Sequence, residues 1–188
     1  MRTRVWALSL ALLAGGATAD RSGGRGVEDE VRALVGTQYS AQRPGDRVAP
    51  HLSCVVEGGG VLWVDGQSAD DWSFGTFDCR GRAVLVLQKI TPNANGGKTK
   101  QIVDSLLMPR FERRPESQRP SSLQFLVMGE CALDGSRDNF FVALGRYGKR
   151  NRIDGRTGVQ HAWGFDVKQG RIVPLPTERI ACDRPDPA

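Results

Sequence analysis

The chain has few of the residues, and none of the short motifs, that mark common classes of enzyme. Its 188 residues include only two histidines, His51 and His161. The sequence contains no G-x-S-x-G elbow, no H-E-x-x-H zinc motif, no phosphate-binding P-loop and no dinucleotide-binding glycine pattern. Histidine on an apolar strand face packs in a core more often than it acts in catalysis. We therefore assign no catalytic residue and expect no cofactor.

The sequence has no long apolar run. A short one occurs near the start of the chain. Arg2 and Arg4 are followed by the apolar segment Val5–Leu13 and then by Ala17-Thr18-Ala19. This order is typical of a secretory signal peptide, and the apolar segment is too short to span a bilayer. We predict a signal peptide over residues 1–19, a flexible leader over 20–26 and a periplasmic or secreted mature protein that is soluble. A retained anchor is the alternative for the same segment.

The excess of positive charge is small. The net charge is +5, and 24 basic residues face 21 acidic ones once the two arginines of the predicted signal peptide are removed. Spread over a whole domain, so small an excess does not favour nucleic acid as a partner. Residues 27–182 have the length of a single domain, followed by a frayed tail over 183–188.

Cysteine is scarce, but its count is even. An even number of cysteines in an exported protein predicts disulfides. The spacing does not fit a zinc site, because no two cysteines stand two to four residues apart, and no metal site is expected. Three pairings of four cysteines are possible. We favour the pairing that closes each half of the chain on itself, with the disulfides Cys54–Cys79 and Cys131–Cys182, and we expect both to be structural.

One short helix is expected near the start of the predicted domain. Val27, Val31, Leu34 and Val35 fall on one helical face, acidic residues occupy the first turn, and Gly36 ends the pattern. Residues 37–50 are expected to form a loop.

The remainder has the periodicity of short strands. Residues 52–57 and 61–64 form two short candidate strands separated by Gly58-Gly59-Gly60, and residues 72–90 form a candidate hairpin that turns at Arg80-Gly81-Arg82. Further candidate strands are 100–108 (a short helix is the alternative), 123–128, 140–144, 159–167 and 171–175, the last limited to an edge by Pro174. Residues 109–122 are expected to form an exposed loop, and Lys168-Gln169-Gly170 a three-residue hairpin loop. Strands do not alternate with long helices, so we predict an α+β domain, mainly antiparallel, with an open curled sheet or a small barrel and two disulfides.

Basic residues gather in one loop between the candidate strands 140–144 and 159–167. Five of its side chains form our candidate binding site: Arg146, Tyr147, Lys149, Arg150 and Arg152. The 14 residues from Gly145 to Gly158 exceed the about two to five of an ordinary hairpin loop, and arginine and tyrosine are enriched at binding hot spots. The alternative is a solvated connection without a partner. A calcium loop at Asp134–Asp138 is not expected, because Gly145 stands where a bidentate glutamate would be needed.

These observations favour binding over catalysis. The first hypothesis is an exported binding protein of the cell envelope, an inhibitor or immunity-type protein that docks onto a protein partner such as a secreted effector or hydrolase. The second is a module that binds an anionic envelope polymer or a lipid head group through arginine-rich loops. The third is a hydrolase that uses His161 with an aspartate. Salt separates the first two, because scattered ionic contacts weaken steeply with ionic strength.

Overall fold

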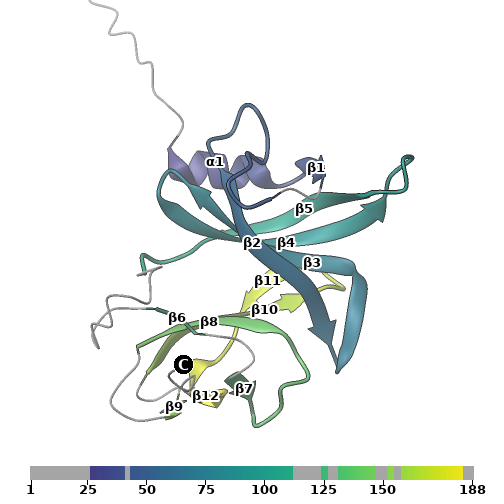
Figure 1. Cartoon of the computed structure of the whole chain (residues 1–188). Coiled ribbons are helices and arrows are strands. Elements are labelled where there is room, and N and C mark those ends of the chain that lie inside the picture. Colours follow the sequence, from purple (N-terminus) through teal and green to yellow (C-terminus); the bar gives the residue numbers. More distant parts are fainter. Residues whose placement is uncertain are drawn as a thin grey trace, which may run out of the picture.

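In the residues that it describes, the computed structural model places one α-helix and three β-sheets in successive layers (Figure 1). It describes residues 26–40, 43–111, 124–126, 131–146, 152–154 and 158–183. The predicted signal peptide, all of the leader but Gly26, and all of the tail but Asp183 lie outside these residues. Three clusters of buried apolar side chains separate the four layers. The prediction of a mainly antiparallel domain with one short helix is confirmed. The described sheets are open, which confirms the open-sheet alternative over the barrel, and there are three of them, stacked on one another.

The helix α1 (Val27–Leu34) covers one face of the first sheet. Val31 and Leu34 are buried in the first core cluster, as the helical periodicity predicted. The helix ends one residue earlier than expected, so Val35 lies outside it with 49% of its surface exposed. Gly36 then adopts a positive φ of 86°, which favours glycine because it has no Cβ.

The first sheet has five strands in the order β1-β5-β4-β3-β2. Their bounds are β1 (Gln38–Ser40), β2 (Val55–Val64), β3 (Gln67–Cys79), β4 (Arg82–Pro92) and β5 (Lys98–Leu107). Successive side chains of a strand point to opposite faces, and both faces of β4 are covered. Val84 and Val86 pack toward α1, while Leu85 and Leu87 pack toward the second sheet. Burial on both faces explains why residues 83–87 are apolar without interruption.

Four expectations about this sheet are settled. Residues 100–108 fall on a strand and not a helix, since β5 covers all of them but Met108, and the hairpin turning at Arg80-Gly81 is confirmed. The loop predicted over 37–50 contains the short strand β1, which pairs with β5. The break predicted at Gly58–Gly60 is wrong, because β2 runs through all three glycines. A Cβ on Gly59 would lie 2.4 Å from the Phe74 carbonyl oxygen, so glycine lets β2 approach β3 closely here.

The second sheet has four strands in the order β11-β10-β8-β6. Their bounds are β6 (Gln124–Leu126), β8 (Phe141–Gly145), β10 (Val159–Asp166) and β11 (Arg171–Pro174). β11 lies at the edge, as Pro174 predicted. Trp163 packs toward the first sheet and only 9% of its surface is exposed, which confirms its burial.

The alternation predicted along residues 159–167 fails at its start. Val159 pairs with Gly145 and His161 pairs with Leu144, so the strand bulges at Gln160. The bulge places Val159 with Ala162 in the third core cluster, opposite Trp163. The turn after β10 spans four residues, 167–170, instead of three, and Gly170 has the expected positive φ of 64°.

The third sheet consists of three short strands that the sequence patterns did not predict. These are β7 (Cys131–Leu133), β9 (Arg152–Asp154) and β12 (Ile180–Asp183), in the order β7-β12-β9, with a short 3-10 helix, η2 (Thr177–Arg179), before β12. Residues 134–136 form the turn expected there, and Asp134 and Gly135 have positive φ values of 52° and 81°.

Both predicted disulfides are present. Cys54–Cys79 joins the segment before β2 to the end of β3, and Cys131–Cys182 joins directly opposed residues of β7 and β12. Each bridge lies inside a core cluster, and all four cysteines are at most 2% exposed. Within the described residues, no helix is long and apolar enough to cross a membrane.

Candidate binding surfaces

The five residues of the predicted basic loop are placed only in part. Arg146 directly follows β8, is exposed, and donates its backbone N–H to the Gly158 carbonyl oxygen at 2.9 Å. Arg152 begins β9 and stands opposite Asp183 of β12, so it belongs to a strand and not to a loop. Tyr147, Lys149 and Arg150 lie outside the described residues, as do residues 112–122 of the predicted loop 109–122. The basic loop therefore remains a prediction as a binding site.

The two histidines have no catalytic surroundings in the described part of the chain. His161 is exposed and stacks on Trp163, with ring centroids 5.7 Å apart and planes at 6°. It forms no hydrogen bond or ion pair with any described residue, and the aspartate that a hydrolase would need beside it is not among its partners. His51 lies in the exposed turn before β2. The described residues include no cluster of three or more potential metal ligands.

An exposed tryptophan on β2 marks a different surface. Trp63 is 52% exposed and Val61 is 46% exposed, and both project from the same side of this edge strand. Their neighbour Leu62 points the other way and is fully buried. Burial of a tryptophan side chain is strongly favourable, so its exposure is unusual. Exposed apolar patches commonly mark binding sites.

A pocket of about 240 Å³ opens beside Trp63, between the first and second sheets. Its wall includes Phe140 and Phe165, whose ring centroids are 5.8 Å apart. The other apolar side chains of the wall include Leu62 of β2, Leu133 of β7, Val173 of β11 and Leu175. Phe74 packs on Phe140 from the first sheet at 4.4 Å. We call the following set the Trp63 surface, in which all but the exposed neighbour Val61 line the pocket: Val61, Trp63, Phe140, Phe165, Val173 and Leu175.

Hydrogen bonds hold the segment 138–140 along the end of β2. The Phe140 N–H donates to the Trp63 carbonyl oxygen at 3.0 Å, and the Gly66 N–H donates to the Asp138 carbonyl oxygen at 2.9 Å. The Asp65 N–H donates to Asn139 Oδ1 at 3.0 Å. These contacts fix the pocket mouth before any partner arrives, which lowers the entropy lost on binding.

The rim of the Trp63 surface is acidic. Asp166 lines the pocket, and Asp65 and Asp138 lie exposed at the turn beside it. Arg146 lies at the other end of β8 from Phe140, so the start of the basic loop and the Trp63 surface are separated by the length of that strand. The two surfaces would therefore meet different parts of a partner.

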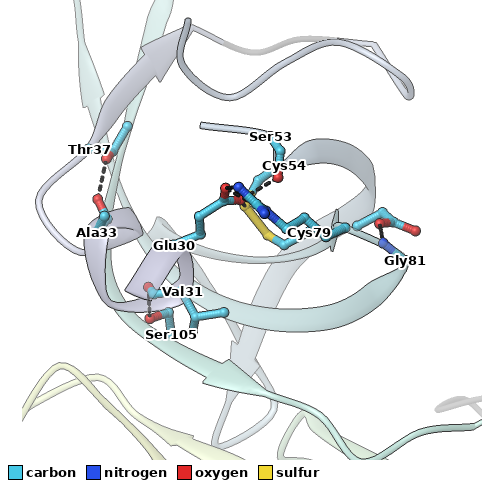
Figure 2. The surroundings of a disulfide bond; sticks show 11 residues. Glu30, Val31, Ala33, Thr37, Ser53, Cys54, Cys79, Gly81 and Ser105 are labelled. Carbon is cyan, nitrogen blue, oxygen red and sulfur yellow. Dashed lines mark hydrogen bonds and ion pairs between the residues drawn. A yellow bond between two sulfur atoms is a disulfide. The ribbon is translucent and has the colours of Figure 1, made fainter. Parts of the chain in front are cut away.

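A buried carboxylate lies against the Cys54–Cys79 disulfide (Figure 2). Glu30 of α1 accepts hydrogen bonds from the Ser53 hydroxyl and from Arg80 Nε, the latter at 2.8 Å. Burial alone would raise the pKa of the Glu30 carboxyl. The hydrogen bond from Ser53 and the interaction with Arg80 outweigh burial, and the pKa lies below its ordinary value. Because these partners already occupy the carboxylate, we assign the Glu30 cluster a structural role.

The Trp63 surface was missed at the sequence level. Residues 61–64 were recognised as strand, but the exposure of Trp63 depends on β2 being an edge strand, which no local pattern indicates. Residues 61–64 are all apolar, so the sequence gives no signal of which of them is exposed. Comparison of the chain with protein-family models, curated proteins and solved structures gives no match.

Proposed function

We propose that the chain is an exported binding protein that docks onto another protein, as an inhibitor or an immunity-type protein does, and does not act by catalysis. The observation that carries the proposal is the half-exposed Trp63 at the mouth of an apolar pocket. Tryptophan is among the residues most enriched at interface hot spots, where it fills or lines a desolvated pocket. Two buried disulfides support export, because such bonds persist mainly in oxidising compartments.

The chemistry of the Trp63 surface indicates the kind of segment it would accept. The pocket suits one apolar side chain of the partner, and the carboxylates of Asp65, Asp138 and Asp166 suit basic groups beside it. Such an interface has a dry centre and a charged rim, so most of its affinity would come from apolar contact. Ionic strength would then change the association rate more than the affinity.

Affinity capture with matched variants tests this proposal. The disulfide-bonded protein is immobilised and exposed to extracts of the compartment into which its native host exports it, and captured proteins are identified by mass spectrometry. We expect Trp63→Ala to reduce recovery of a specific partner at least tenfold. Val35→Ala is the matched control, because Val35 is an equally exposed apolar residue beyond α1.

The outcome also separates the proposed function from the anionic-polymer alternative. Recovery that persists in 0.5 M salt and depends on Trp63 supports docking on a protein. A partner recovered equally well by Trp63→Ala and by the parent chain would show that this surface is not the docking site. Binding that disappears in salt and is insensitive to Trp63 would favour the polymer.

A further inference from the structure

Arg82 carries a buried donor that no described group satisfies. It is the first residue of β4, half-buried, and its Nη2 donates to the Met108 carbonyl oxygen at 3.1 Å. Its Nε is shielded from solvent and has no hydrogen-bond partner among the described residues. Buried guanidinium nitrogens are almost always paired, because an unpaired charged donor in a protein interior is costly.

Arg80, two residues before Arg82 in the same hairpin, does have a carboxylate partner. Arg80 contacts the Glu30 carboxylate, with Nη2 2.6 Å from Oε1. Asp78 lies in the same hairpin, and its Oδ1 accepts the Gly81 N–H at 2.6 Å. Arg82 thus remains without a carboxylate partner in the described part of the chain.

A pocket opens where Arg82 lies. It measures about 190 Å³ and is formed by the turn at Gly81, the start of β4 and the segment Pro109–Phe111 after β5. Arg110 lines the same pocket, is exposed and forms no ion pair with a described residue. Two guanidinium groups therefore line one small cavity, beside Pro109 and the ring of Phe111.

We propose that this pocket is an anion-binding site that takes a single oxyanion group, a phosphate or a carboxylate, with the Arg82 guanidinium as the inner cation and Arg110 as the outer cation. A planar guanidinium presents its N–H groups in a fork that matches two oxygens of such a group. The cavity has room for one group of this size and not for an extended chain. The site is separate from the Trp63 surface, and it stands or falls independently of the proposed docking function.

Nuclear magnetic resonance of the arginine side chains tests the site directly. The disulfide-bonded protein is titrated with inorganic phosphate, with acetate and with chloride at matched ionic strength, and the Nε–Hε signal of Arg82 is followed. We expect a saturable shift with phosphate or acetate and only a small linear drift with chloride. The tighter of the two ligands identifies the oxyanion: phosphate would indicate phosphorylated ligands, and acetate would indicate carboxylated ones.

Three variants locate the binding. Arg82→Lys keeps the charge but removes the fork, and we expect it to weaken binding at least tenfold. Arg110→Gln should weaken binding severalfold, with the saturable shift of Arg82 still visible. Arg171→Gln, which removes an exposed arginine from the second sheet, should leave affinity unchanged. A shift that does not saturate, or a binding constant that is the same in the parent, Arg82→Lys and Arg110→Gln proteins, would overturn the proposal.

Discussion

Glu30 and Arg80 form an ion pair in which one partner is buried and the other reaches solvent. The side chain of Glu30 is 4% exposed and that of Arg80 is 46% exposed. Arg80 occupies a hairpin turn with a positive φ of 56°, followed by Gly81 at 75°, which is the conformation of a two-residue turn between antiparallel strands. The pair therefore connects helix α1 to the β3–β4 turn beside the Cys54–Cys79 disulfide.

The lowered pKa of Glu30 predicts a contribution to stability that depends on pH. A carboxyl whose folded-state pKa lies below its unfolded value stabilises the fold above the unfolded pKa, about 4.3, and loses this contribution as pH falls through the folded pKa. We expect the free energy of unfolding of the parent to fall in this acidic range. In Glu30→Gln the decrease should be smaller, as measured by urea denaturation at several pH values between 2 and 7.

A surface ion pair provides the control for this prediction. Arg32 and Asp29 form a pair on α1 in which both side chains are more than half exposed. Exposed pairs contribute about 0–1 kcal/mol, whereas removal of one partner of a buried pair costs more. Arg80→Gln should therefore be more destabilising than Arg32→Gln at pH 7. Equal effects of the two substitutions would contradict the role assigned to Glu30.

Truncation of Trp163 and of Trp63, both near the interface between the first and second sheets, should change folding stability by very different amounts. Trp163 is buried in the core cluster between these sheets, so Trp163→Ala should cost about 3–5 kcal/mol of folding stability. Trp63 is half exposed, and Trp63→Ala should change stability by less than about 1 kcal/mol. Chemical denaturation of both variants measures the difference. A large loss of stability in Trp63→Ala would mean that this residue serves the fold and not a partner.

The Cys131–Cys182 bridge should be essential to the third sheet. β7, β9 and β12 have three or four residues each, too few to hold together by backbone hydrogen bonds alone. Replacement of both cysteines by alanine removes a cross-link worth about 2–4 kcal/mol. We expect amide hydrogen exchange in β7 and β12 to accelerate strongly, while exchange in β4 changes less. Uniform acceleration through β4 would show that the sheets unfold as one unit.

The sequence predicted elements whose pattern is set locally. The uninterrupted apolar residues 83–87 reflect burial of a strand on both faces, and the helical spacing of apolar residues in α1 reflects burial of one face. Strand and helix could therefore be recognised from the sequence pattern. The disulfide pairing followed from chain separation. The strand break at Gly58–Gly60 was predicted wrongly, because glycine there allows a close approach to Phe74, which depends on the register in which β2 pairs with β3.

The candidate sites depend on long-range neighbours and were harder to predict. Among the described residues, no strand pairs with β2 along most of its outer edge, and Trp63 stays half exposed there. Arg82 has a backbone partner but no carboxylate partner among these residues, since Glu30 contacts Arg80. Neither fact has a signal within a few residues of the position. Clusters of like charge are visible in a sequence, and for that reason the basic loop was the site proposed from sequence alone.

The basic loop gives the last prediction. Charge reversal tests the loop, but Arg152 is unsuitable for it, because Arg152 stands opposite Asp183 in the register of β9 and β12. A glutamate at position 152 would oppose a like charge and destabilise the third sheet, which would confuse the result.

Arg146→Glu combined with Arg150→Glu avoids this, since Arg146 is exposed after β8. If the loop binds an acidic region of the captured partner, the double variant should weaken binding at least tenfold, or about 1.4 kcal/mol, with an unchanged melting temperature. Affinity equal to that of the parent would leave the loop as a solvated connection and the Trp63 surface as the remaining docking site.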